Sequence, residues 1–228
     1  MTDPPVPARP AATVMLLRDT EPGVEVLMVS RPARGFFGGL TVFPGGAVDP
    51  EDESALAAEV VISDDADRVY RVAALRELAE ETGIAVVVGG LARAPTGRGL
   101  ALFQSLKQQG LTLDGSALTL VSRWVTPEPA PTRFDARFFL ARADDAPQVR
   151  LDVVELVDHM WTTPSSALHR HEQGELEMFL PTIAHLRWLE RRSTVEEAIA
   201  SASGADGRSL IQPQRMEDGS MLPIHMPS

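Results

Sequence analysis

Three glutamates stand out in the segment RELAEETGI, residues 76–84, because they crowd a short stretch that ends at a glycine. Glu77, Glu80 and Glu81 have the i, i+3, i+4 spacing that places side chains on one face of a helix. The helix is predicted to end at Gly83, since glycine suits the left-handed residue that follows a helix. Two carboxylates then lie in the last turn, where the helix dipole disfavours negative charge by about 0.3–1 kcal/mol each. The pattern indicates that a cation supplied from outside the chain balances these charges.

The composition narrows the class of protein. The chain has 228 residues, of which 44% are hydrophobic and 23% are charged, as in ordinary globular proteins. It contains no cysteine, which excludes thiol catalysis, disulfides and cysteine-ligated zinc. The formal net charge of −11 argues against a nucleic-acid duplex as partner. A small phosphorylated substrate that meets a few local cations remains compatible with this charge.

The sequence shows no signal for a membrane or for export. No apolar run reaches the length of a membrane span. The first residues, MTDPPVPARP, lack the apolar core of a signal peptide, and the last residues, HMPS, are not a peroxisomal address. A cytoplasmic protein that does not contact a membrane is therefore the default expectation.

The hydrophobic pattern predicts one α/β domain with a mixed β-sheet at residues 11–200. Residues 1–10 are predicted to be an extended tail, and 201–228 an irregular extension in which Asp218-Gly219 could turn a small hairpin. Strands are expected at 12–19, 24–31, 84–88, 117–125, 132–142 and 153–161. Helices are expected at 63–83, with Ser63 or Asp64 as its cap, and at 99–110, from Pro164, at 181–191 and at 193–204.

Two segments together resemble the signature of the Nudix hydrolases, G-x5-E-x7-R-E-U-x-E-E-x-G-U, where U is bulky and aliphatic. The second half of this box is complete in residues 76–84, and the first half begins with FPGG, residues 43–46, which is typical of the family. The box therefore spans 46–84, with an insertion of about 16 residues at roughly 53–68. The first glutamate of the box is either replaced by Asp52 or supplied elsewhere.

The resemblance implies a Nudix-type α/β/α sandwich with a mixed β-sheet and a pyrophosphohydrolase that depends on Mg²⁺, with Mn²⁺ as a substitute. Glu77, Glu80 and Glu81 would be the metal ligands, because carboxylate oxygens suit Mg²⁺ and the cation neutralises a diphosphate. The same three glutamates and Arg76 are the expected catalytic residues, with Arg76 pairing with Glu80 four positions on. The general base stays open among Glu77, Asp49, Asp52 and Glu128.

The substrate is expected to be a nucleoside diphosphate linked to another group. Residues 31–46 partly match a pattern of the coenzyme A diphosphatases in this superfamily, R-S-x3-R-x3-G-x3-F-P-G-G, so coenzyme A or acyl-coenzyme A is the first choice. Arg31 and Arg34 would meet its phosphates, and the glycines Gly45 and Gly46 would let the backbone approach the metal and the substrate. The alternative for the two arginines is that they hold the loop to acidic neighbours.

Other functions remain open. The substrate could be ADP-ribose, a nucleotide sugar, a dinucleotide or an oxidised nucleotide, or the chain could be a non-catalytic Nudix-fold module that binds a ligand. A homodimer is compatible with the sequence. The insertion is predicted to be surface structure, with an apolar patch that covers the edge of the core or a partner subunit: Leu56, Val60, Val61 and Ile62.

Overall fold

The structure is a computed structural model that describes residues 6–21, 23–33, 38–63, 66–128, 130–204, 210–213 and 226. Its strands are β1 (Arg9–Thr20), β2 (Gly23–Ser30), β3 (Thr41–Val42), β4 (Gly45–Ala47), β5 (Val61–Ile62), β6 (Ile84–Val87), β7 (Gly90–Arg93), β8 (Leu113–Asp114), β9 (Thr119–Val125), β10 (Phe134–Arg142), β11 (Asp158–Thr162) and β12 (Leu210–Ile211). Its helices are α1 (Ala55–Val60), α2 (Arg68–Thr82), α3 (Leu100–Gln109), α4 (Pro164–Glu172), α5 (Leu180–Leu189) and α6 (Val195–Gly204), with short 3₁₀ helices η1 (Pro50–Glu53) and η2 (Gly115–Ala117).

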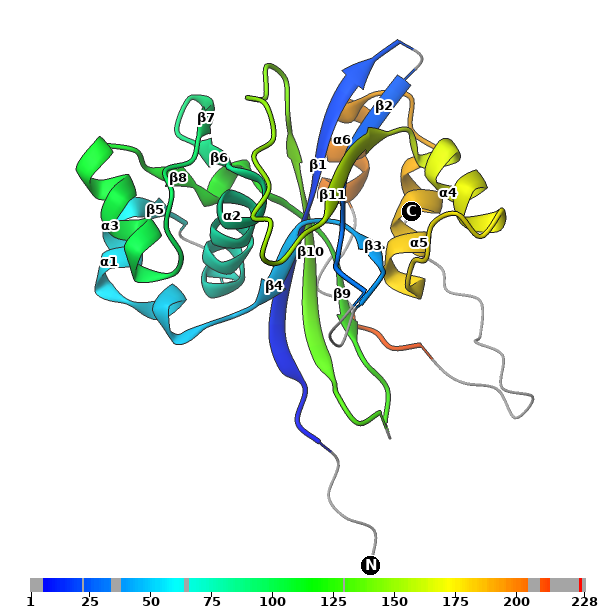
Figure 1. Ribbon diagram of the computed structural model, residues 1–228, viewed down its shortest axis with the longest axis horizontal. Helices are drawn as coiled ribbons and strands as arrows, with labels where there is room; N and C mark the ends of the chain where they lie inside the picture. Colours follow the sequence, from blue (N-terminus) through cyan, green and yellow to red (C-terminus); the bar gives the residue numbers. More distant parts are fainter. Residues whose placement is uncertain are drawn as a thin grey trace, which may run out of the picture.

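The predicted sandwich with a mixed sheet is confirmed. Among the described residues, the strands of the large sheet follow the order β11-β2-β1-β10-β9-β12, with β3 paired to β2 and β4 paired to β1. The pairs β1–β10 and β9–β12 are parallel, and the others are antiparallel. Helix α2 lies on one side of this sheet and α4, α5 and α6 lie on the other (Figure 1).

The alternating side chains of β1 explain why helices cover both faces of the sheet. Val14 and Leu16 belong to the apolar core under α2, whereas Met15 and Leu17 belong to the core under α4, α5 and α6. All four side chains are fully buried. Because successive side chains of a strand point to opposite faces, a continuous apolar run predicts a strand that is buried on both sides.

Helix α2 is the element that carries the three glutamates. It ends as predicted at Gly83, whose φ of 68° is left-handed. Its start differs from the prediction: the cap position is Asp67, so Ser63 does not cap it, and Asp64 lies outside the described residues. Residues 71–79 are buried all round, because the helix lies between the large sheet and a second group of short elements (Figure 1).

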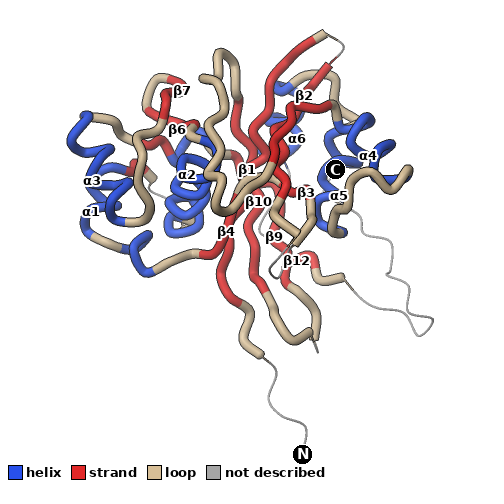
Figure 2. Tube along the Cα trace, viewed as in Figure 1, coloured by secondary structure: helices blue, strands red, loops and turns tan. Residues whose placement is uncertain are grey.

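That second group contains most of the insertion, which is only partly surface structure, and the predicted apolar patch covers the edge of the core. Strands β5, β8, β6 and β7 form a small sheet, and α1 packs against α3 (Figure 2). Val60 and Val61 are buried in the core and Leu56 packs against it, whereas Ile62 is 48% exposed. The insertion is part of the domain because α3 and β8, which follow much later in the chain, complete an apolar core around it.

The predicted strand at 153–161 is wrong over its first half. Only Asp158–Thr162 form a strand, and residues 153–155 lie in a turn. The side chain of Asp152 accepts a hydrogen bond from the backbone N–H of Val154 at 2.9 Å, and the backbone N–H of Leu156 reaches the Asp152 carbonyl at 2.9 Å. A local bond from an aspartate to the backbone two residues on competes with strand pairing.

The two ends of the chain differ from the prediction where they are described. Residues 9 and 10, expected in the tail, are the first residues of β1. Helix α6 runs to Gly204 and β12 adds a short parallel strand beside β9, so part of the expected irregular extension is ordered structure. The expected hairpin at 218–219 lies outside the described residues. Within the described part of the chain, none of the helices has both the length and the apolar character needed to cross a bilayer.

Candidate active site

Glu77 and Glu80 of α2 line a cavity of about 570 Å³, and Glu81 is buried behind them. Its walls come from the 45–51 segment, from α2, and from the turn that leads into α3, with Arg31 and Glu155 at the border. The pairing of β4 with β1 brings the glycines of the FPGG motif against α2. The motif and the helix therefore meet although the insertion separates them in the sequence.

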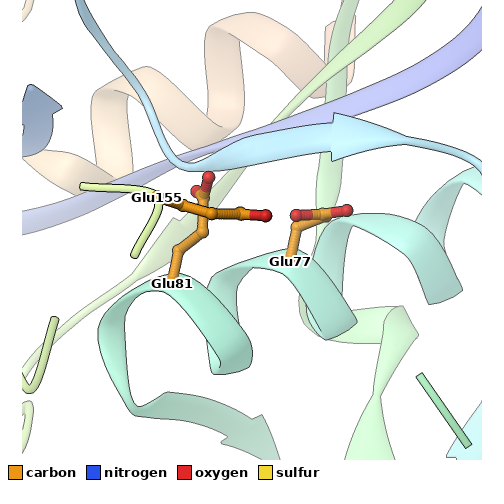
Figure 3. A group of neighbouring side chains, drawn as sticks. All are labelled: Glu77, Glu81 and Glu155. Carbon is orange, nitrogen blue, oxygen red and sulfur yellow. The ribbon is translucent and has the colours of Figure 1, made fainter. Parts of the chain in front are cut away.

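Three carboxylates form a tight group at this cavity. One oxygen each of Glu77, Glu81 and Glu155 lies within 4.8 Å of the other two. Figure 3 shows Glu77 and Glu81 on successive turns of α2, while Glu155 reaches toward them from a loop. Glu80, which the sequence placed with the other two, lines the same cavity but accepts a hydrogen bond from the N–H of Gly99 at 2.7 Å. The structure thus brings two of the three predicted ligands together and adds a third carboxylate.

The two glycines leave no room for side chains. A Cβ at Gly46 would lie 2.6 Å from the carboxylate of Glu77, and one at Gly45 would lie 2.4 Å from the backbone oxygen of Ala12. Gly45 has a φ of 155° and donates its N–H to Oε2 of Glu81 at 2.9 Å. The predicted close approach of the backbone at these positions is therefore present.

Arg76 is the buried cation of the site. It donates from Nε to Asp52 at 2.7 Å and from Nη2 to the other oxygen of Asp52 at 3.0 Å, a bidentate pair. Its Nη1 lies 2.7 Å from Glu77 and 3.4 Å from Glu80, so the predicted pairing four positions on is present. Asp52, which stands where the Nudix box has its first glutamate, is fully buried. Its role in this structure is to hold the guanidinium of Arg76.

Of the other candidates for a general base, Asp49 lines the cavity and Glu128 does not. Glu128 instead pairs with Arg133 at 3.2 Å. Asp49 has a half-exposed side chain that lies 3.5 Å from Arg76.

Arg31 reaches the site and Arg34 lies outside the described residues. Nη2 of Arg31 donates to the carbonyl of Gly45 at 2.8 Å and to Oε1 of Glu81 at 3.2 Å. Its side chain keeps 25% of its surface exposed at the cavity. Arg31 thus balances Glu81 while remaining open to an anionic ligand.

Glu155 is a site residue that sequence reasoning missed. Two backbone N–H groups, from Arg150 and Asp152, donate to the carbonyls of Thr82 and Glu81 at 2.7 and 3.1 Å. The last carbonyls of a helix lack partners within the helix, and this segment satisfies two of them. The docking brings Glu155 to the glutamates of α2, and no motif in the sequence marks it.

Arg98 was also missed, although its neighbours carry a signal. It lies between Gly97 and Gly99, directly before α3, and its guanidinium contacts carboxylates at the cavity. Glycines on both sides of Arg98 indicate a turn directly before the helix, with the arginine side chain at its surface.

Burial makes the three glutamates of α2 hard to ionise. It raises the pKa of Glu81 to about 8, against the opposing effect of Arg31, and the nearby Glu77 raises it further. Burial also raises the pKa of Glu77 to about 6, although Arg76 counteracts it. The pKa of Glu80 is raised by burial as well, while the N–H of Gly99 and the charge of Arg76 act in the other direction. A divalent cation would remove this electrostatic cost, and a set of carboxylate oxygens suits Mg²⁺ or Mn²⁺.

Comparisons with known proteins agree with this geometry. The family model described as NUDIX domain matches residues 7–180. A solved NUDIX hydrolase from Alicyclobacillus acidocaldarius is 35% identical, with a TM-score of 0.75, and the match covers 86% of this chain and 96% of that one.

Two curated proteins are similar at lower identity. A Caenorhabditis elegans protein with nudix hydrolase 7 in its name is 26% identical over 191 residues, which cover 80% of this chain. The human acyl-coenzyme A diphosphatase NUDT19 is 26% identical over 236 residues, with 77% of this chain covered. The matches span 61% and 63% of the lengths of these two relatives. Because the family model matches most of the sequence and the glycine loop meets the glutamate helix in space, the chain belongs to the Nudix family of hydrolases.

Proposed function

We propose that this protein is a pyrophosphohydrolase that uses Mg²⁺, or Mn²⁺ in its place, to cleave a nucleoside diphosphate linked to another group. The observation that carries the proposal is the group of Glu77, Glu81 and Glu155 beside the Gly45-Gly46 backbone. Glu77 and Glu81 are the deeply buried members and would hold the cation. A bound Mg²⁺ neutralises the phosphate oxygens and the charge that develops between them during the reaction.

Two further residues would accept the proton of the attacking water and bind the phosphates. Hydrolysis breaks one P–O bond of the anhydride, adds the hydroxyl of water to one phosphorus and leaves the proton for the other product or a base. The Glu155 side chain keeps 34% of its surface exposed, so it is the member of the group best placed to take a proton from water. Arg31 would bind phosphate oxygens, because a guanidinium matches them in geometry and charge.

Coenzyme A or acyl-coenzyme A is the first substrate to test. Two observations support it: the arginine and glycine pattern of residues 31–46, and the similarity to the human acyl-coenzyme A diphosphatase. The products would be 3′-phosphoadenosine 5′-phosphate and a phosphopantetheine. A cytoplasmic location and a homodimer are further parts of the proposal.

A panel of substrates with and without Mg²⁺ tests the proposal. Coenzyme A, acetyl-coenzyme A, ADP-ribose, a nucleotide sugar and a dinucleotide are incubated with the protein, and mass spectrometry identifies the products. Cleavage of coenzyme A at the diphosphate supports the substrate claim, whereas cleavage of ADP-ribose or a nucleotide sugar alone overturns it and leaves the reaction type standing. Binding without any cleavage favours a ligand-binding module.

The variant Arg31→Ala tests the phosphate contact within the same panel. Loss of a charged contact costs about 1.5–3 kcal/mol, which is roughly ten- to a hundredfold in kcat/KM. The loss should be larger for coenzyme A than for a substrate without a 3′-phosphate. An equal loss for both would show that Arg31 serves only the diphosphate or the Glu81 carboxylate.

A further inference from the structure

We infer that Arg98 is a positioning residue that holds the Glu155 carboxylate at the Glu77–Glu81 pair, an inference that rests on the proposed hydrolase function. Its guanidinium bridges two parts of the chain that are far apart in the sequence. It lies 2.5 Å from Glu155 and 3.3 Å from Asp152 on the loop, and 3.6 Å from Glu80 on α2. Nothing in the Nudix box assigns a role to this arginine.

The backbone around Arg98 is fixed to the end of α2. The N–H of Ala94 donates to the carbonyl of Gly83 at 2.9 Å, and the N–H of Gly99 donates to Glu80 at 2.7 Å. Gly97 has a φ of 143°, and a Cβ there would lie 2.9 Å from the backbone nitrogen of Leu102. These contacts hold the backbone of the turn against Glu80 and α3, and from there the guanidinium of Arg98 reaches Glu155.

The loop that bears Glu155 packs against the core directly after this residue, where Leu156 is 1% exposed, but not directly before it. Val153 and Val154, directly before Glu155, are 82% and 78% exposed. Backbone hydrogen bonds hold the loop at Arg150 and Asp152, and the N–H of Val157 donates to the carbonyl of Ser30 at 2.9 Å. These bonds place the backbone but leave the Glu155 side chain free to turn, so its ion pair with Arg98 is the contact that directs it.

Charge makes this contact necessary. Three carboxylates within 4.8 Å repel one another, and Glu155 lies in an irregular turn whereas Glu77 and Glu81 lie on a helix. Without a cation beside it, Glu155 would move toward solvent and away from Glu77 and Glu81. Arg98 contacts Glu80 on α2 and Glu155 on the loop at the same time. Its ion pair with Glu155 therefore keeps this carboxylate at the cavity.

Another role for Arg98 is a direct contact with the substrate, since its side chain is 46% exposed and lines the cavity. The two roles differ in steady-state kinetics. A lost contact with the bound substrate raises KM, whereas a misplaced Glu155 lowers kcat, because a shift of about 1 Å in a reacting group can reduce the rate about a hundredfold.

The test compares Arg98→Ala and Arg98→Lys with Glu155→Gln and with the double variant Arg98→Ala/Glu155→Gln. We expect Arg98→Ala to lower kcat about ten- to a hundredfold with KM changed less than about threefold, and Arg98→Lys to restore part of the loss. The double variant should be no slower than Glu155→Gln alone, because Arg98 acts through Glu155. A raised KM at unchanged kcat, or independent losses that multiply in the double variant, would overturn the inference.

Arg93→Ala is the matched control. Arg93 is a nearby arginine that donates to the carbonyl of Gln148 at 3.5 Å and contacts no carboxylate of the site, so its loss should leave kcat unchanged. If the wild type cleaves no substrate, the proposed function fails, and a crystal structure of Arg98→Ala still decides the positioning role. Glu155 should then lie away from Glu77 and Glu81, and an unmoved Glu155 counts against the inference.

Discussion

Glu81 carries a high electrostatic cost, because its carboxylate is fully buried beside that of Glu77. Its two oxygens accept hydrogen bonds from Arg31 and from the N–H of Gly45, and yet burial keeps its pKa raised to about 8. A residue chosen for stability alone would be apolar or amide-bearing at this position. A bound cation would offset the cost of burying this carboxylate, so the arrangement favours Glu81 as a metal ligand.

The variants Glu77→Gln and Glu81→Gln should each lower kcat by about a hundredfold or more, because the amide keeps the shape but cannot balance a divalent cation. Glu80→Gln should cost less, since Glu80 bonds to Gly99 and pairs with Arg76 and Arg98. Steady-state kinetics at saturating Mg²⁺ measures the loss of kcat in each of the three variants. Near-normal turnover of Glu81→Gln would remove that residue from the proposed metal site.

The metal-free protein should lose stability as the pH rises from about 4.5 to 8. Burial raises the folded pKa of Glu77 to about 6 and of Glu81 to about 8, above the ordinary value of 4.5, so the folded state binds more protons than the unfolded state in this window. The free energy of unfolding then falls as the pH rises through the folded pKa values.

Melting temperatures in EDTA at pH 5, 6, 7 and 8 measure this effect, with Glu81→Gln as the comparison, because other groups titrate equally in both proteins. The wild type should lose stability relative to the variant as the pH rises. A constant difference between the two proteins would contradict the raised pKa.

At the scale of elements, β4 and α2 approach so closely that only glycine fits between them. Ala at position 46 would place its Cβ 2.6 Å from the Glu77 carboxylate. We expect Gly46→Ala to lower kcat at least tenfold by displacing Glu77, while the fold survives, because the atom displaced belongs to a side chain.

The control for this prediction is Gly204→Ala, at the end of α6, where an added Cβ meets nothing within 4 Å. It should leave both activity and melting temperature close to those of the wild type. A Gly46→Ala variant with full activity would show that the Glu77 carboxylate can move without consequence.

The insertion shows a second property at the element scale. Its helix α1 packs on α3, and the turn before α3 supplies Arg98 and Gly99 to the cavity, while η1 supplies the buried partner of Arg76. The inserted residues therefore support α3 and the core beside it, while the residues that line the cavity come from outside the insertion.

At the scale of the whole molecule, Mg²⁺ or Mn²⁺ should raise the melting temperature. The cation binds the folded site and relieves its carboxylate repulsion, and at a free concentration of about 100 times Kd the gain is about 2.7 kcal/mol. The double variant Glu77→Gln/Glu81→Gln should show little of this shift. An equal shift in both proteins would assign the effect to the general acidity of the chain, whose net charge is −11.

Much of the fold and two of the three members of the carboxylate group follow from the sequence. The apolar runs at 12–19 and 24–31 predict strands, and β1 and β2 confirm them, because β propensity and apolar character act within one segment. The end of α2 at Gly83 is likewise a local property, set by the freedom of glycine at positive φ. Glu77 and Glu81 meet because one helix spaces them.

The rest depends on contacts between segments that are distant in the sequence. Glu155 joins the group because its loop satisfies the last carbonyls of α2, and Glu80, at the same cavity, bonds to the backbone N–H of Gly99. Asp52 pairs with Arg76 across the insertion, and the insertion is buried because α3 and β8 pack on it. Sequence spacing thus determined which side chains one helix presents, whereas only the tertiary structure decided which partners they meet, since those partners arrive from other segments through packing and backbone hydrogen bonds.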